Sequence, residues 1–319
     1  MANYKKLKVI VFSDGRPGHE KQSLGIVNAL GNKTSIELIR VSVKKNGFLT
    51  NFFDTLFFLL GICACKDTRF AEADVFIGTG RHTHLPLLKA QKMYGGHSVC
   101  CMTPNVLFRS HFDFCFVPSH DSIKKRGNIV CTLGAPNALY DHERHSEDIG
   151  LILIGGISGK QRWSTHKTIQ HVQEVLEAFP DKKWKVSSSP RTPNETIYAL
   201  ETLNEKINRF EFFHYKDTKN GWVEDQYHYC KNVWVTADSI SMVFEALSAG
   251  CQVGLLPVDW KNKISKFQQN EKFLIKNNYV MTLEQKRHNT NKIISQKKFN
   301  EASRCAQLML DKWWKKDVL

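Results

Sequence analysis

The sequence predicts an α/β protein of two Rossmann-like domains that face each other across a cleft. Each half of the chain opens with a short apolar strand, a glycine-containing loop and a helix, at 8–30 and again at 151–179. A further unit of strand, loop, helix and strand follows at 233–256. Such units bring loops to the carboxyl ends of parallel strands, where phosphates and sugars bind. A chain of 319 residues is long enough for two domains.

Short apolar runs between polar loops predict the individual elements. In the first half, strands are expected at 8–13, 36–41, 74–80, 99–102, 112–117 and 129–132, with a helix at 22–30. In the second half, strands are expected at 151–154, from 185, at 210–214, 233–235 and 253–256, and helices at 165–179, 194–208, 222–230 and 240–247.

The domain boundary is predicted in the charged, apolar-poor segment 138–150. We therefore expect an N-terminal domain over 1–145 and a C-terminal domain over 146–319. The last helix, expected over 297–314, ends in two tryptophans. It either returns to the first domain or anchors on a membrane.

The segment 48–62 is unusually apolar, although Asn51 and Asp54 interrupt it. Its fifteen residues fall short of the roughly 20 that span a bilayer. Two interpretations stay open, a buried helix and a helix lying in the membrane interface. Basic flanking residues favour the interface, namely Lys44, Lys45, Lys66 and Arg69.

Composition limits the partners and the compartment. Lys and Arg outnumber Asp and Glu by 45 to 31, a net charge of +14 that suits an anionic partner such as a membrane surface, a nucleotide or a nucleic acid. No nucleic-acid-binding motif is present, so we expect no nucleic-acid partner. The nine cysteines include no Cys-x-x-Cys pair, which is typical of neither a zinc site nor a disulfide framework. Without a secretory signal at its start, the chain is expected in the cytosol.

The loop Asp14-Gly-Arg-Pro-Gly-His-Glu20 follows the first strand and gathers reactive groups in one turn. It lacks the G-x-G-x-x-G fingerprint, which argues against a nicotinamide enzyme. Gly15 and Gly18 permit tight backbone geometry. This concentration of an acid, a base and an arginine favours a functional loop over a plain polar one.

Three loops of the second half are candidates for binding a phosphate or a sugar. Gly155-Gly-Ile-Ser-Gly-Lys160 lets backbone amides approach an anion, although it lacks the Walker spacing. Arg191 can pair with a phosphate in bidentate fashion, or it is an ordinary surface arginine. Asp238 or Ser239 can cap the helix 240–247, on which Glu245 lies too deep for a capping role. Ser241 and Glu245 share one stripe of that helix, facing either a cleft or solvent.

These motifs together resemble one family. Asp14-Gly-Arg-Pro-Gly-His-Glu-x-Gln-Ser-Leu-Gly25, Ser189-Pro-Arg-Thr-Pro193 and Val235-Thr-Ala-Asp-Ser-x-Ser-Met-Val-x-Glu-Ala-Leu247 are similar to motifs of the plant mitochondrial-fission factor and its bacterial relatives. The resemblance implies a GT-B-like architecture. Bacterial members are assigned as glycosyltransferases of lipopolysaccharide core assembly, whereas the plant member acts as an interaction factor.

A more distant likeness is to the lipid-linked N-acetylglucosaminyl transferase of peptidoglycan synthesis. That enzyme has a Gly-His loop like Gly18-His19 and a Gly-Gly-Ser-type loop like 155–158. It also has a late Ser…Glu helix, similar to Ser239–Glu245. The residues Asp-Gly-Arg-Pro that precede Gly18 here depart from its pattern.

The resemblance and the loops together define the expected site. His19 is the candidate base, with Asp14 in reserve. The donor-binding residues are expected to be Gly155, Gly156, Ser158, Lys160, Ser189, Arg191, Thr192, Asp238, Ser239, Ser241, Met242 and Glu245. The diphosphate is expected on 155–160, helped by Arg191 and Ser239, and the ribose on Glu245. The acceptor side is expected to include Arg16, Gly18, Gln22, Arg81, His82 and Asn105.

The expected function is transfer of a sugar from a nucleotide-sugar donor to a lipid-linked or lipopolysaccharide-core saccharide. No Asp-x-Asp motif is present, so no metal is required, and no cofactor beyond the nucleotide-sugar co-substrate is expected. We expect a cytoplasmic protein peripheral to the anionic inner membrane. The alternative is a membrane-associated adaptor without catalysis.

Overall fold

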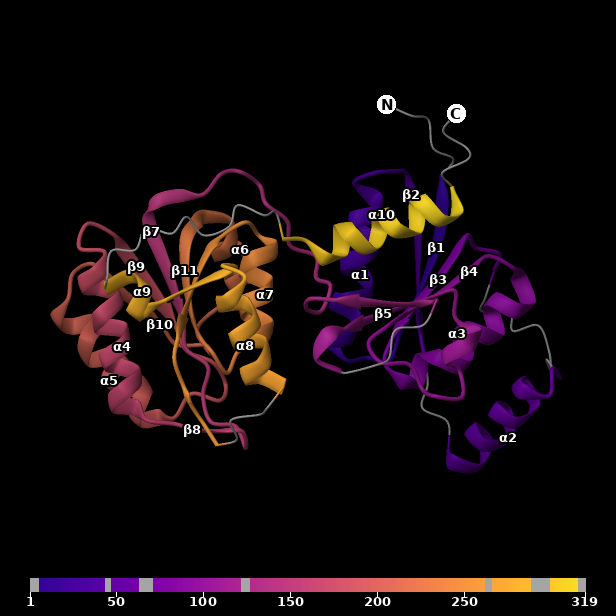
Figure 1. Cartoon of the computed structure of the whole chain (residues 1–319), viewed down its shortest axis with the longest axis horizontal. Helices are drawn as coiled ribbons and strands as arrows, with labels where there is room; N and C mark the ends of the chain where they lie inside the picture. The colour runs from indigo at the N-terminus through magenta and orange to yellow at the C-terminus, as the bar shows by residue number, and fades with distance from the viewer. Residues whose placement is uncertain are drawn as a thin grey trace. The chain divides into compact units, whose positions relative to one another are not determined.

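A computed structural model describes residues 6–43, 47–62, 71–121, 127–261, 266–287 and 299–314. The chain divides into two compact units, unit 1 with residues 1–138 and 301–319, and unit 2 with residues 139–300 (Figure 1). Each unit contains one six-stranded sheet whose neighbouring strands all run parallel. The predicted α/β class with two Rossmann-like sheets is therefore confirmed. That the two units face each other across a cleft stays a prediction.

The sheet of unit 1 has the strand order β2-β1-β3-β4-β5-β6. Its strands are β1 (Leu7–Ser13), β2 (Ile36–Ser42), β3 (Val75–Thr79), β4 (His97–Cys101), β5 (Phe114–Pro118) and β6 (Ile129–Thr132). Its helices are α1 (Pro17–Gly31), α2 (Phe48–Leu59), α3 (Arg81–Tyr94) and α10 (Glu301–Trp313), with short 3-10 turns at Arg109–His111 and Ser119–Asp121.

Both faces of this sheet are covered, which explains why its strands are near-continuous apolar runs. Successive residues of β1 point to opposite faces. Val9 and Val11 belong to a core shared with α1 and α10. Ile10 and Phe12 belong to a second core shared with α3. The chain order reverses between β1 and β3, which makes the carboxyl ends of these two strands a switch point where ligands bind in such sheets.

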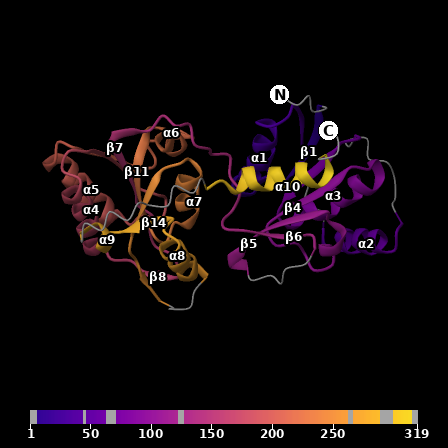
Figure 2. The same ribbon diagram turned by 45° about the horizontal axis from the view of Figure 1, so that its top comes forward.

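The last helix, α10, packs in unit 1. Figure 2 shows it lying beside α1, and its buried face includes Cys305 and Met309. At its end the ring of Trp313 stacks on His97, with ring centroids 4.0 Å apart. The sequence had left open whether this helix returns to the first domain or anchors on a membrane.

The main sheet of unit 2 has the strand order β10-β9-β7-β11-β12-β14. Its strands are β7 (Ser146–Leu153), β9 (Lys183–Ser187), β10 (Phe210–Phe213), β11 (Cys230–Thr236), β12 (Gln252–Leu256) and β14 (Val280–Thr282), and β8 (Gln161–Arg162) pairs with β13 (Asp259–Trp260) as a small ribbon. Its helices are α4 (Thr165–Ala178), α5 (Asn194–Lys206), α6 (Trp222–Tyr229), α7 (Ile240–Ser248), α8 (Lys266–Lys276) and α9 (Leu283–Arg287). The switch point here lies between β7 and β11.

The chain enters unit 2 after Ala138, whereas the sequence placed the boundary after residue 145. The intervening residues pack within unit 2. His145 Nε2 donates a hydrogen bond to the carbonyl oxygen of Tyr227 at 3.1 Å. Gly250 has φ +83°, and a Cβ added there would lie 2.3 Å from the carboxyl carbon of Asp141. These contacts attach the crossover segment to unit 2.

Helix α2 falls in the segment for which two interpretations were open. Its large apolar side chains are mostly exposed, so the buried-helix interpretation is wrong. The basic flanks at 44–45, 66 and 69 lie outside the described residues. Within the described part of the chain, no helix is both long and apolar enough to cross a membrane.

Candidate functional site

Unit 1 carries a histidine–carboxylate pair at its switch point. His19 Nδ1 lies 3.0 Å from Oδ2 and 3.2 Å from Oδ1 of Asp14. The Asp14 side chain is 1% exposed and that of His19 is 18% exposed. A carboxylate only accepts, so neutral His19 carries its proton on Nδ1 and keeps an acceptor lone pair on Nε2. Asp14 therefore holds the imidazole in one orientation, and the role of His19 as a base stays a prediction.

Local backbone geometry builds this pair. Gly15 has φ +77°, and the Arg16 amide donates to Asp14 Oδ1 at 3.2 Å, which closes the turn before α1. Gly80, at the end of β3, has φ +90° and faces the imidazole. A Cβ at residue 80 would lie 2.5 Å from His19 Nδ1. A glycine at this position thus allows the ring to sit where Asp14 can hold it.

Other predicted acceptor-side residues lie in the same loop, on α1 and at the start of α3. Arg16 Nε lies 4.0 Å from Asp14 Oδ2, and Gln22 Nε2 donates to the carbonyl oxygen of Gly18 at 3.3 Å. Arg81 and His82 directly follow Gly80. They therefore lie beyond the carboxyl end of β3, which is adjacent to that of β1. Both residues belong to the first turn of α3, a helix that the sequence analysis did not predict.

Asn105 lies in the loop after β4, and its backbone amide contacts a buried histidine of α3. Its amide approaches His84 Nδ1 at 3.5 Å, and His84 Nε2 lies 3.4 Å from Cys100 Sγ. Burial, and then the nearby Arg81 and His82, lower the pKa of His84 to about 4. His84 is therefore neutral at pH 7, with Nδ1 as acceptor and Nε2–H as donor. It supports the loop that carries Asn105.

Unit 2 brings three predicted loops together around a buried carboxylate. The Gly156 amide donates to Asp238 Oδ2 at 3.2 Å, and the Gly155 amide donates to Thr236 Oγ1 at 2.8 Å. A Cβ at residue 155 would lie 2.4 Å from both Asp238 oxygens and from Ser239 Oγ. Gly155 is therefore required by packing against Asp238. No hydrogen-bond partner within the described structure reaches Asp238 Oδ1.

Arg191 joins the loop after β9 to this cluster. Its Nη2 lies 2.9 Å from Asp238 Oδ2 and donates to Ser239 Oγ at 3.2 Å, and its Nη1 donates to the Gly156 carbonyl oxygen at 3.2 Å. Ser189 Oγ donates to the Gly155 carbonyl oxygen at 2.9 Å, and Thr192 Oγ1 to that of Ile154 at 3.1 Å. The guanidinium remains partly exposed beside the start of α7.

The backbone of the glycine loop is largely committed to these contacts. The amides of Gly155 and Gly156 donate as described, and the Ile157 amide donates to the Arg191 carbonyl oxygen at 2.9 Å. Three of the amides that the sequence assigned to a diphosphate are thus already used. At the start of α7, by contrast, the amides of Ile240 and Ser241 have no intrahelical acceptor, as at any helix N-terminus.

The remaining predicted donor residues lie around this centre. Ser158 Oγ donates to Gln161, and Lys160 and Ser241 are exposed. The Met242 carbonyl oxygen accepts a hydrogen bond from Tyr227 at 3.2 Å. Burial, and then the nearby Glu245 carboxylate, raise the pKa of Tyr227. Glu245 is half-buried, so it is not turned fully to solvent.

Sequence reasoning missed four supporting residues, Gly80, His84, Gln161 and Thr236. Gln161 is buried, and its Nε2 donates to the Gly156 carbonyl oxygen at 2.7 Å. Gly80 had a signal, because it ends a strand in the pattern Gly-Thr-Gly and precedes a polar turn. His84 and Thr236 act through contacts with residues distant in sequence, which spacing does not reveal, whereas Gln161 bonds to residues of its own loop.

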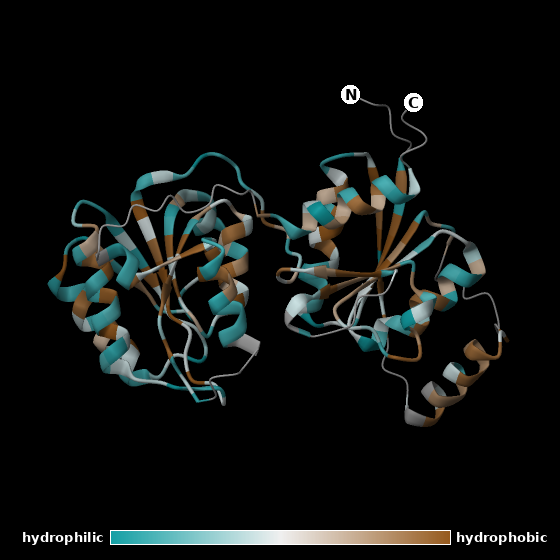
Figure 3. Cartoon of the chain, viewed as in Figure 1, coloured by the Kyte–Doolittle hydropathy of each residue, from teal (hydrophilic) through white to brown (hydrophobic). Residues whose placement is uncertain are grey.

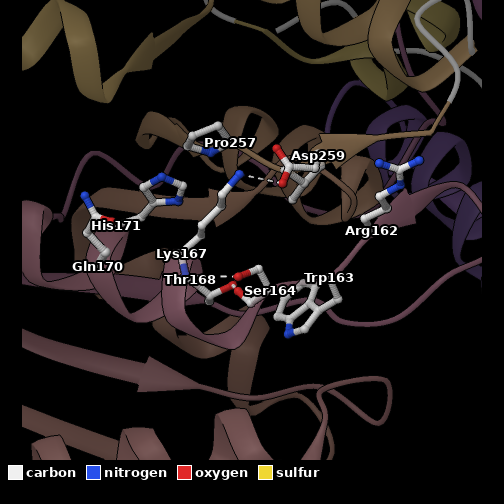
Figure 4. A pocket seen from close by; sticks show the side chains of 10 residues that line it. Arg162, Trp163, Ser164, Lys167, Thr168, Gln170, His171, Pro257 and Asp259 are labelled. Atoms are coloured by element: carbon white, nitrogen blue, oxygen red, sulfur yellow. Dashed lines mark hydrogen bonds and ion pairs between the residues drawn. The ribbon is translucent and has the colours of Figure 1, made fainter.

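Unit 2 also has a pocket of about 230 Å³ between α4 and the ribbon of β8 and β13 (Figure 4). None of the predicted site residues lines it. Lys167 and Asp259 pair across it at 2.7 Å, and both side chains are more than half exposed. Exposed pairs of this kind contribute little to stability. Because these opposite charges satisfy each other, the pocket is a weaker candidate for an anionic ligand than the start of α7.

In the residues that the structure describes, no group of three or more His, Cys, Asp or Glu side chains is arranged to hold an ion.

Comparison with known families gives one match over nearly the whole chain. The sequence model described as mitochondrial fission ELM1 matches residues 17–313. No curated protein matches the sequence.

Solved structures show the same fold at low sequence identity. A protein of Listeria monocytogenes assigned as a UDP-N-acetylglucosamine 2-epimerase is 12% identical, with 98% of each chain covered and a TM-score of 0.59. The UDP-GlcNAc 2-epimerase of Methanocaldococcus jannaschii is 12% identical, covering 96% of this chain and 100% of the other, with a TM-score of 0.52. MurG of Acinetobacter baumannii is also 12% identical, covering 97% and 99%, with a TM-score of 0.48. The first two likenesses show a GT-B-type fold and nothing more specific.

Proposed function

The chain belongs to the mitochondrial fission ELM1 family, and from that premise we propose that it is a GT-B-type glycosyltransferase. It transfers a sugar from a nucleotide-sugar donor to a saccharide carried on a lipid or a lipopolysaccharide core. The proposal rests on two clusters of polar residues, one at the switch point of each sheet. One holds an oriented base, His19, and the other combines an arginine with a helix N-terminus.

The donor diphosphate is assigned to the start of α7. Arg191, Ser239 Oγ and the open amides of Ile240 and Ser241 converge there. A helix N-terminus and an arginine both stabilise the negative charge that grows on a departing diphosphate. Asp238 holds the guanidinium in place before the donor binds. Relative to the sequence-based assignment, the charge-binding role moves from the glycine loop to α7.

The other residues of the donor site are assigned by their position on α7 or in the loop after β7. Glu245 lies about one and a half turns into α7, where a carboxylate can accept hydrogen bonds from both ribose hydroxyls. Lys160 and Ser158 lie in the loop after β7 and are assigned to the far side of the diphosphate or the sugar. Met242 and Ser241 complete the wall of this donor site.

The acceptor is assigned to unit 1. His19 Nε2 removes the proton from the acceptor hydroxyl as its oxygen attacks the anomeric carbon, and the bond from that carbon to the diphosphate breaks. The nucleoside diphosphate leaves with the bonding electrons. The imidazolium that forms is stabilised by Asp14 at 3.0 Å. No resident cofactor takes part in this proposal, and Arg191 and α7 provide the positive charge that a metal supplies in other enzymes.

The place of action is proposed as the cytoplasmic face of the inner membrane, with the protein bound peripherally. The net charge of +14 suits an anionic membrane surface. The seven cysteines in the described residues are all free thiols, as expected in a reducing compartment.

A thermal-shift screen of nucleoside diphosphates and nucleotide sugars tests the donor assignment, since a ligand that binds only the folded state raises the Tm. Calorimetry then follows Arg191→Ala and Glu245→Ala. We expect each variant to lose affinity for the best ligand by at least about tenfold, the loss of one charge-assisted contact. Glu201→Ala, which removes an exposed glutamate from α5, is the matched control. Equal affinity in Arg191→Ala, Glu245→Ala and wild type would refute the donor site.

An adaptor without catalysis is the second candidate, favoured by the exposed apolar surface of α2. It predicts full cellular function when His19 and Glu245 are both replaced. It also predicts loss of function when Phe52, Phe53 and Phe57 become polar. The transferase predicts that the first replacement abolishes function.

A further inference from the structure

Helix α2 presents its apolar side to solvent. Phe52 is 56% exposed and Phe53 51% exposed. At 3.6 residues per turn, the exposed apolar residues fall on one side of the helix. They are Leu49, Phe52, Phe53, Leu56, Phe57, Leu59 and Leu60. Figure 3 shows α2 as mostly hydrophobic along its length.

The opposite side of α2 attaches it to unit 1. Phe58 is 6% exposed, and its ring packs edge-on against Phe108 and His111 with centroids 5.9 and 5.3 Å away. Lys92 Nζ lies 5.6 Å from the Phe58 ring centroid. Asp54 Oδ1 pairs with Lys89 Nζ at 2.7 Å. Asp54 and the anchoring ring of Phe58 thus face the protein while the apolar side is exposed, which is the reverse of an ordinary surface helix.

A second apolar segment adjoins this anchor. Val106 is 75% exposed and Leu107 is 55% exposed, directly before Phe108. We name the exposed side of α2 together with Val106 and Leu107 the apolar surface of unit 1. Contiguous apolar patches of this kind are rare on proteins that stay in water, and they mark binding surfaces.

We propose that the apolar surface of unit 1 docks on an anionic lipid bilayer. Its α2 residues are only Leu and Phe, whereas a protein interface carries a polar rim with hydrogen bonds. An apolar side without charges, on a helix too short to span a bilayer, is typical of helices that lie in the membrane interface. The net charge of +14 and the neighbouring Lys92 complement anionic headgroups.

Docking places the loop of Asn105 next to the lipid surface, because Asn105 precedes Val106. If the acceptor saccharide is carried on a lipid, its sugar then enters unit 1 from the membrane side. This consequence rests on the proposed function, whereas docking itself does not. A failure to bind vesicles would therefore refute docking, and a failure to bind nucleotides would refute the proposed function.

The test is co-sedimentation of the full chain with vesicles of phosphatidylcholine alone and of phosphatidylcholine with phosphatidylglycerol. We expect binding to the anionic vesicles, and weaker binding to the neutral ones. Phe52→Gln with Phe53→Gln should lower the partition coefficient by roughly tenfold for each ring withdrawn from the bilayer. Val106→Gln with Leu107→Gln tests the second segment separately, and both double variants should keep wild-type circular dichroism because the replaced side chains are exposed.

Matched controls separate docking from general surface apolarity. Tyr198→Gln with Phe273→Gln removes two exposed rings from unit 2, and Thr50→Gln changes a polar position on α2. Both controls should bind vesicles as the wild type does. The proposal is overturned if the wild type binds neither vesicle or if the α2 variant binds undiminished. It is also overturned if the wild type is a dimer that the α2 variant converts to monomer, because a second copy then covers the surface.

Discussion

Replacing Gly155 by Ala tests how the glycine loop works. A Cβ at residue 155 would lie 2.4 Å from both carboxylate oxygens of Asp238 and from Ser239 Oγ. The surrounding residues are buried, so the cluster must shift, at an overpacking cost of about 1–3 kcal/mol. The displaced carboxylate also loses its hold on Arg191. Losing one charge-assisted contact weakens nucleotide binding by roughly ten- to a hundredfold.

Gly159→Ala is the matched control in the same loop. A Cβ at residue 159 meets no atom within 4 Å, so stability should stay within about 0.5 kcal/mol of wild type. Thermal unfolding measures the first effect, at about 2–4 °C per kcal/mol for a unit of this size. Calorimetry with a nucleoside diphosphate measures the second effect.

The two variants distinguish two ways of binding phosphate. If Gly159→Ala weakens nucleotide binding as much as Gly155→Ala, the backbone of the glycine loop holds the phosphate. The assignment to α7 then fails. If Gly155→Ala keeps both stability and affinity, the packing of the loop on Asp238 is refuted.

Three further changes test separate parts of the site. Burial lowers the pKa of His84 to about 4 from 6.5, so the unfolded state binds more protons and stability falls as pH drops through this range. Between pH 7 and pH 5 this loss is about 2 kcal/mol in urea unfolding. His84→Asn should reduce the loss by that amount, and an equal loss in both proteins would contradict the burial argument. Gly80 has φ +90°, and a Cβ there would lie 2.5 Å from His19 Nδ1. Gly80→Ala should therefore lower kcat about a hundredfold with unchanged donor affinity. An unchanged kcat would exclude His19 as the base. Arg191→Lys cannot keep contacts to both Asp238 and the helix start. Calorimetry should therefore show about tenfold weaker nucleotide binding. Full affinity would mean that a point charge suffices to bind the nucleotide.

Most strands could be predicted because both faces of each sheet are covered, which makes a strand a continuous apolar run. Helix α3 was missed for a physical reason. Its first turn is polar, and Pro86 lies inside it, where a proline normally ends a helix. The start of β7 was also missed, because Ser146, Glu147 and Asp148 are polar and the last two are exposed.

The sequence could predict which loops carry the candidate site residues. It could not predict the contacts that those residues make. Loop position after a strand brought Asp14, His19, Arg191 and Asp238 to attention. Spacing could not reveal that Asp238 is buried and paired with Arg191. Nor could it reveal the direction of α2, since the apolar side of a helix is expected to be buried by this periodicity, whereas here that side is exposed.

A single-turnover transfer assay tests whether the protein is a glycosyltransferase that uses His19 as its base. Wild-type protein and His19→Gln are each mixed with the best-binding nucleotide sugar and a lipid-linked saccharide, and nucleoside diphosphate and product are followed together. The transferase assignment predicts that wild type releases diphosphate and forms a new glycosidic bond. His19→Gln should bind the donor equally well but neither release diphosphate nor form the bond. Turnover by His19→Gln at the wild-type rate, or conversion of the donor to an isomer without transfer, would contradict it.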